Sequence, residues 1–61
     1  MRGEKLKAAR LKAGLTQTQL AEKIGCTQQE IARYEAGGRE PRASMLKRLA
    51  VALGCMMEDL V

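Results

Sequence analysis

The sequence predicts an all-α protein, with five short helices sharing one core in a single domain over residues 1–61. Apolar residues recur at helical spacing along the whole chain, and strand-forming residues are few. Glycines stand where helices would stop, at Gly14, Gly25, Gly37-Gly38 and Gly54. Two of the segments between them open with Thr and carry Gln or Glu three residues later, which is the pattern of a capping box.

The first predicted helix runs from Gly3 to about Ala13, and Gly14 ends it. Its apolar face carries residues spaced three and four apart, namely Leu6, Ala9, Arg10 and Ala13.

The second predicted helix has a complete start signal. Thr16 is a good N-cap and Gln19 can close the capping box, while Leu15 can pack against Leu20 as a hydrophobic staple. Its buried stripe consists of Leu20, Ala21 and Ile24.

The third predicted helix repeats this pattern. Thr27 caps it, Glu30 closes a second box, and Cys26 can pack against Ile31. Ile31 and Tyr34 continue the apolar stripe up to Gly37.

Only Gly25-Cys26-Thr27 separates these two capped helices, so together they predict a helix-turn-helix. The steep crossing requires a small residue, which Ala21 provides, and the turn requires a positive φ angle, which Gly25 can adopt. The turn alone also fits an ordinary helical hairpin in a bundle.

The composition argues against an enzyme. The chain has no His and a single Ser, Ser44, and its two Cys have no base to activate them. Two Cys without His are too few to hold a metal ion, so we expect no metal and no cofactor. Cys26 and Cys55 each follow a glycine that ends a helix, and we expect both to be buried, reduced thiols.

The net charge of +4 is compatible with a polyanionic partner, whereas Tyr34 as the only aromatic residue argues against modules that stack RNA bases. The N-terminus lacks an apolar signal core, and the longest apolar run is too short for a membrane span. We therefore expect no membrane association and a cytoplasmic, nucleoid-associated location.

From Leu6 to Leu60 the chain resembles the phage-repressor (Cro/cI-like) helix-turn-helix family. The matching residues are Arg10, Gly14-Leu15-Thr16-Gln17, Leu20-Ala21, Ile24-Gly25, Thr27-Gln28-Gln29, Ile31-Ala32-Arg33-Tyr34-Glu35, Gly37, Arg39-Glu40-Pro41, Leu46, Leu49-Ala50, Ala52-Leu53-Gly54 and Glu58-Asp59-Leu60. The resemblance implies a five-helix lambda-repressor-like DNA-binding domain whose third helix is the recognition helix. It also implies a partly buried ion pair between Arg10 and Glu35.

The chain departs from the family at two caps. Arg42 follows Pro41 where the family often has Ser, Thr or Asp, although Ser44 could cap a fourth helix that begins later. Met56 stands where a Ser often caps the fifth helix, so we expect that helix to be poorly capped.

Four residues of the third helix are expected to face the bases of double-stranded DNA, namely Gln28, Gln29, Ala32 and Arg33. Glutamine matches the N6 and N7 edge of adenine, and arginine matches O6 and N7 of guanine. The alternative is a generic polar helix face.

The DNA backbone is expected to contact polar and basic residues around the recognition helix, namely Gln17, Thr27, Arg39, Arg42 and Lys47. The resemblance assigns this role to Gln17, which also lies at a helix N-terminus. Lys5, Lys7 and Lys12 are expected to form a solvated face instead.

The predicted function is that of a repressor-like prokaryotic or phage transcription regulator, which binds a palindromic operator as a weak homodimer and takes no small-molecule ligand. The alternative is a protein-interaction module, such as an antitoxin-like or accessory subunit. Candidates for the dimer contact are Met56, Met57 and Val61, unless the C-terminus is simply a frayed tail.

Overall fold

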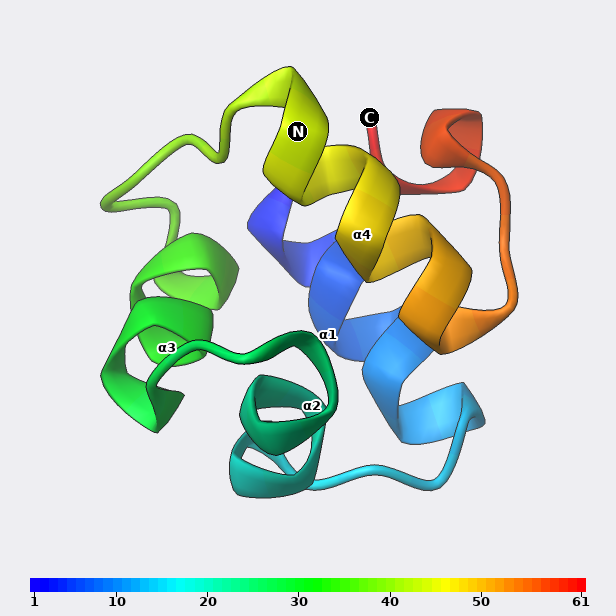
Figure 1. Ribbon diagram of the computed structural model, residues 1–61. Coiled ribbons are helices and arrows are strands. Elements are labelled where there is room, and N and C mark those ends of the chain that lie inside the picture. The colour runs from blue at the N-terminus through cyan, green and yellow to red at the C-terminus, as the bar shows by residue number, and fades with distance from the viewer.

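The computed structural model describes all 61 residues and consists of helices joined by short loops (Figure 1). The elements are α1 (Gly3–Lys12), α2 (Gln17–Ile24), α3 (Gln28–Ala36), α4 (Ala43–Leu53) and η1 (Met57–Leu60). The prediction of an all-α fold is confirmed. The count of five α-helices is not, because η1 is a single turn of 3₁₀ helix.

Contacts at both ends of η1 define its short length. Met56 offers no side-chain cap, and the Asp59 carboxylate instead accepts a hydrogen bond of 3.0 Å from the Met56 N–H. Leu60, the last residue of the turn, is fully buried in the core. These two contacts hold both ends of the segment, and a run of four residues is the usual length of a 3₁₀ helix.

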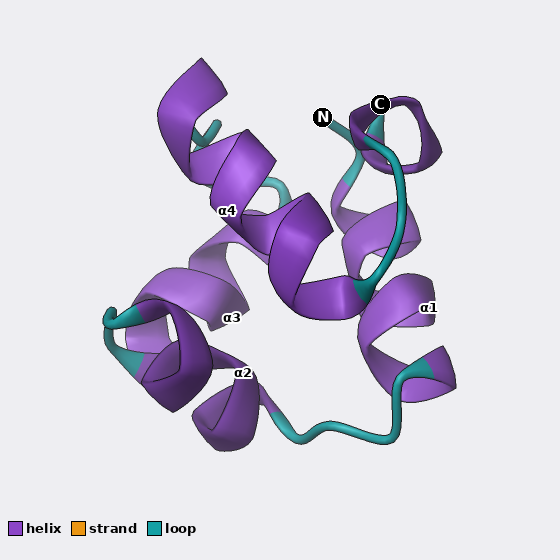
Figure 2. Cartoon of the chain, turned by 45° about the vertical axis from the view of Figure 1, so that its right-hand side comes forward, coloured by secondary structure: helices purple, strands orange, loops and turns teal.

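The helices enclose a core of buried apolar side chains, comprising Leu6, Leu20, Ala21, Ile24, Ile31, Tyr34, Leu49, Ala50 and Leu60. Helix α3 packs against α1 and α2, α4 packs against α2, and η1 joins α1 to α4. The two termini lie side by side (Figure 2), because the Arg2 N–H donates a hydrogen bond of 2.9 Å to the Leu60 carbonyl. The apolar stripes predicted for α2 and α3 are confirmed, because the core contains Leu20, Ala21 and Ile24 of α2 and Ile31 and Tyr34 of α3.

The predicted apolar face of α1 is only partly buried. Leu6 and Arg10 are buried and Ala9 is half-buried, but Ala13 is exposed and lies beyond the helix, which ends at Lys12. Gly3 packs against the end of α3, where a Cβ atom would stand 2.2 Å from the Glu35 carbonyl oxygen and 2.6 Å from that of Tyr34. Only glycine allows the two helix backbones to approach this closely.

The capping box of α2 is complete. The Gln19 N–H donates to Thr16 Oγ1 at 3.0 Å, and the Thr16 N–H donates to Gln19 Oε1 at 2.9 Å. The tight turn that follows contains Gly25 at φ +79°, as the sequence predicted. Local backbone chemistry therefore defines both ends of α2, and the turn at Gly25 begins the connection to α3.

Two other predicted caps are absent or incomplete. At α3 the Glu30 N–H donates to Thr27 Oγ1 at 3.2 Å, but the Glu30 side chain does not return to the Thr27 N–H. The Glu30 side chain lines a hollow that Arg39 and Arg42 also line. Helix α4 begins directly after Arg42 with no side-chain cap, so Ser44 lies inside its first turn and does not cap it.

The cysteines are free but only half-buried, which corrects the expectation that they are buried. Burial raises the pKa of both thiols above the 9.0 of an ordinary thiol, and Glu30 and Asp59 raise those of Cys26 and Cys55 further. None of the helices has the length and apolarity needed to cross a membrane.

Candidate nucleic-acid interface

A buried ion pair joins α1 to α3. Arg10 Nε lies 2.6 Å from Glu35 Oε2, and Arg10 Nη2 donates to Glu35 Oε1 at 3.2 Å. The two side chains are 9% and 5% exposed, so this bidentate pair is shielded from water. A third donor of Arg10, Nη1, binds the Leu15 carbonyl at 2.8 Å and so holds the loop before α2.

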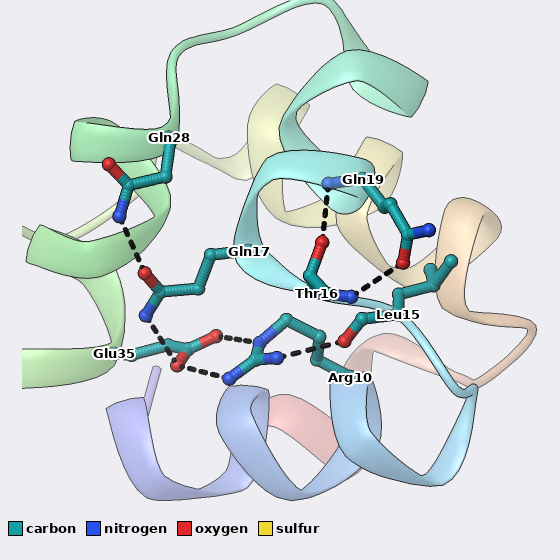
Figure 3. Close-up of polar contacts among 7 residues, drawn as sticks. All are labelled: Arg10, Leu15, Thr16, Gln17, Gln19, Gln28 and Glu35. Atoms are coloured by element: carbon teal, nitrogen blue, oxygen red, sulfur yellow. Dashed lines mark hydrogen bonds and ion pairs between the residues drawn. The ribbon is translucent and has the colours of Figure 1, made fainter.

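Gln17 and Gln28 extend this pair to the molecular surface (Figure 3). Gln17 Nε2 donates to Glu35 Oε1 at 3.1 Å, and Gln28 Nε2 donates to Gln17 Oε1 at 2.7 Å. Each glutamine is the first residue of its helix. A continuous hydrogen-bonded chain therefore runs from the interior to the exposed start of α3.

The Glu35 carboxylate determines which way round the side-chain amides of Gln17 and Gln28 lie. Glu35 can only accept, so Gln17 must present its NH₂ group to Glu35 and its oxygen to Gln28. Gln28 in turn uses one N–H on Gln17, which leaves its second N–H and its carbonyl oxygen unpaired. The exposed amide of Gln28 is thus oriented before any ligand arrives.

The outer face of α3 differs in one respect from the prediction. Gln28, Gln29 and Arg33 are exposed, but Ala32 is half-buried. Ala32 directly follows the fully buried Ile31, and its short side chain lies at the edge of the exposed face. It can contact a ligand only through its methyl group.

The residues predicted to contact the DNA backbone fall in three places. Gln17 lines a hollow of ≈ 520 Å³ together with Thr18 of α2 and Gln28 of α3, and Thr27 caps α3. Arg39 and Arg42 line the hollow that Glu30 shares. Lys47 lies apart from both, in a groove between α2 and α4.

Sequence reasoning missed the link between Gln17 and Gln28. The signal was present, because both helices begin with the same pair, Thr16-Gln17 and Thr27-Gln28. The hydrogen bond itself depends on how the turn brings the two helix starts together.

Comparisons with known proteins agree with this geometry. The helix-turn-helix family matches residues 6–60. The chain is 36% identical, over all of its length, to the SPbeta prophage-derived HTH-type transcriptional regulator YonR of Bacillus subtilis, and it spans 56% of that relative.

Solved structures of similar proteins share the fold. The restriction-modification controller protein C.AhdI of Aeromonas hydrophila is 29% identical with a TM-score of 0.91, over 97% of this chain and 86% of that one. The P22 c2 repressor in complex with a synthetic operator is 30% identical with a TM-score of 0.90, over 97% of this chain and 89% of that one. The clp gene regulator ClgR of C. glutamicum is 28% identical with a TM-score of 0.88, over 95% of this chain and 75% of that one. The chain belongs to the Cro/cI-like helix-turn-helix family.

Proposed function

We propose that the protein is a transcription regulator that binds double-stranded DNA in a sequence-specific manner, with α3 in the major groove. The hydrogen-bonded chain from Arg10 through Glu35 and Gln17 to Gln28 carries this proposal. A surface glutamine held in one orientation has lost its rotamer entropy before binding, which favours recognition of one base edge. The family supports the same conclusion, as do a transcriptional regulator and an operator-bound repressor among the similar proteins.

The base contacts follow from the free hydrogen-bonding groups. Gln28 retains one N–H and its carbonyl oxygen, which match N7 and the N6 amino group of adenine. The exposed Arg33 guanidinium matches O6 and N7 of guanine, and Gln29 offers a second amide beside Gln28. Ala32 supplies a methyl group suited to the methyl group of thymine.

The DNA backbone is assigned to groups that surround these residues. Thr27 Oγ1 accepts from Glu30, so its own hydroxyl proton is free for a phosphate oxygen. Gln17 stands at the N-terminus of α2, where backbone N–H groups also favour an anion. Arg39 and Arg42, with Lys47 as a more distant contact, add positive charge after α3.

A homodimer on a palindromic operator completes the proposal. Met56 and Val61 are 63% and 51% exposed at the C-terminus and offer an apolar contact. Met57 is half-buried against the core, so only part of it is available for a partner. A contact this small predicts dimers that form mainly on DNA.

Selection from random-sequence duplexes, followed by binding measured at several salt concentrations, tests the proposal. We expect a palindromic site whose affinity falls at least about tenfold between about 50 and 200 mM salt, because bound phosphates release counterions. Gln28→Ala and Arg33→Ala should each cost about 1–3 kcal/mol on the selected site and little on random DNA.

The matched control is Lys7→Ala, which removes an exposed charge from α1, the helix expected to carry a solvated face. It should lower binding to selected and random DNA by the same small factor. Salt-independent binding, or unchanged base preference in Arg33→Ala, would contradict the assignment of α3.

A further inference from the structure

A groove between α2 and α4 plays no part in the proposed base contacts. Its volume is ≈ 410 Å³. Its lining consists of Lys23, Ile24, Lys47, Arg48, Val51 and Ala52, and we call it the α2–α4 groove.

The centre of the α2–α4 groove is apolar. Val51 is 74% exposed, more than any other large apolar residue of the chain. Ile24 is buried beside it, and Ala52 is half-buried. Val51, with Ala52 next to it in the lining, therefore gives the groove an apolar floor that is open to solvent.

The rim of the groove carries only positive charge. Lys23, Lys47 and Arg48 line it, and none of the three forms an ion pair. Glu22, the acidic residue next to Lys23 in sequence, is not part of the lining. Arg48 is fixed in place because its guanidinium donates to the Ile24 carbonyl at the end of α2.

We propose that the α2–α4 groove docks an amphipathic helical segment of a partner protein, with apolar residues on one face flanked by carboxylates. The apolar residues would cover Val51, and the carboxylates would pair with the three cations. Phosphate groups alone would leave Val51 uncovered, which argues for a protein rather than DNA. Lys47 is shared with the proposed DNA backbone contacts, whereas Val51 and Lys23 are not assigned to DNA, so the groove is tested at Val51 and Lys23.

A second copy of this chain fits the groove less well. Its acidic segment with exposed apolar residues lies at the C-terminus, around η1. There Asp59 is bound to the Met56 N–H and Leu60 is fully buried, so this segment cannot present a continuous apolar row between carboxylates.

A designed peptide serves as the probe, a helix-forming sequence with Leu at every third or fourth position and Glu on both sides of that row. Binding is followed by backbone amide shifts in NMR spectra and by fluorescence anisotropy. We expect shifts confined to the end of α2 and the middle of α4. Val51→Ser and Lys23→Glu should each weaken binding by about fivefold or more.

The chain offers matched controls for both variants. Leu11→Ser removes a comparably exposed apolar residue outside the groove, and Lys7→Glu makes the same charge change on α1. Both should bind the peptide within about twofold of the parent. Operator binding is also measured on all four variants. Failure of the DNA-binding proposal can then be distinguished from failure of the groove to bind the peptide.

Several outcomes would overturn the inference. Equally tight binding of a peptide with Lys in place of Glu, or with Ser in place of Leu, would show that the groove does not recognise an acidic, amphipathic segment. Self-association that Lys23→Glu abolishes would assign the groove to a second copy. Shifts of the groove amides on adding random duplex DNA, lost in Lys23→Glu but not in Lys7→Glu, would assign it to phosphates.

Discussion

A single carboxylate organises the polar interior of the protein. Glu35 accepts two hydrogen bonds from Arg10 and one from Gln17, and its side chain is 5% exposed. A buried carboxylate is tolerated only when such donors replace its hydration. The stability that Arg10 and Glu35 contribute therefore depends on both side chains being present.

Removing one partner of this pair should be more damaging than removing both. Arg10→Met leaves Glu35 without its counter-ion, and we expect the free energy of unfolding to fall by about 3 kcal/mol or more. The double variant Arg10→Met, Glu35→Leu should recover part of this loss, because no uncompensated charge stays buried. Urea denaturation of the single and double variants measures the coupling, and strictly additive losses would mean that the pair acts as two independent residues.

The thiols give a prediction at high pH. Their pKa values are raised by burial, so Cys26 and Cys55 stay protonated in the folded protein at pH values where the unfolded chain has begun to ionise. The stabilisation is fully present below the unfolded pKa of about 9 and is lost as the pH rises through the folded values. The pH midpoint of alkylation by iodoacetamide should therefore lie above 9.0 in the folded state. In urea the midpoint should return to about 9.0.

A variant with both cysteines replaced by Ala separates this effect from the titration of lysines. Its stability should fall less steeply above about pH 9 than that of the parent chain. An alkylation midpoint below that of a free thiol would show activated rather than suppressed cysteines.

At the scale of elements, the quality of the helix starts differs across the fold. Helix α2 has a reciprocal capping box, α3 has half of one, and α4 begins with an uncapped Arg42. Helix α1 likewise begins without a side-chain cap, at Arg2, but only the uncapped start of α4 coincides with a residue that we assign to the DNA backbone. The positive charge at Arg42 also lies unfavourably at the positive end of the α4 dipole.

Arg42→Ser should raise the stability of the protein and lower its affinity for DNA. A serine N-cap contributes about 0.5–2 kcal/mol, so the melting temperature should rise, while affinity for both selected and random DNA should fall. Arg39→Ser is the control, because Arg39 does not cap a helix and its replacement should lower affinity without raising stability. Thermal melts and anisotropy titrations on the same samples give both quantities, and a fall in both would show that Arg42 stabilises α4 through other contacts.

One copy of the described domain is too small to read both halves of the proposed palindrome. Its longest dimension is 23 Å, whereas half-sites one DNA turn apart are separated by about 34–36 Å. The proposed palindrome requires two copies of this domain, with their recognition helices held at this spacing. Met56 and Val61 are the exposed apolar residues at the C-terminal end that could hold them.

Charge placed in this contact should weaken cooperative binding. Met56→Glu and Val61→Asp should lower the Hill slope on the full palindrome, while binding to a single half-site stays unchanged. Both residues are exposed, so the melting temperature should change little. An unchanged Hill slope would place the dimer contact on another surface.

Local chemistry explains which features the sequence could predict. The burial of Leu20, Ile24 and Ile31 follows from helical spacing, and the positive φ of Gly25 follows from the short turn. The exposure of Gln28 and Arg33 on α3 follows from the same spacing.

Other features depend on contacts between elements that spacing does not reveal. The Gln17–Gln28 hydrogen bond depends on the angle between two helices, and the half-buried state of Ala32 depends on its neighbours across the fold. The half-burial of Cys26 and Cys55 and the 3₁₀ geometry of η1 arise in the same way.

The contact between Gly3 and the end of α3 restricts how the protein can vary. Any side chain at position 3 would meet the Tyr34 and Glu35 carbonyl oxygens and push α1 away from α3, moving Arg10 relative to Glu35. In a saturation library of the first helical turn, selected for operator binding, only glycine should survive at position 3, whereas position 7 should accept most residues. Enrichment of Ala at position 3 would show that α1 can shift without disturbing recognition. If only glycine survives, position 3 is among the least variable positions of the chain, although it lies far in sequence from α3.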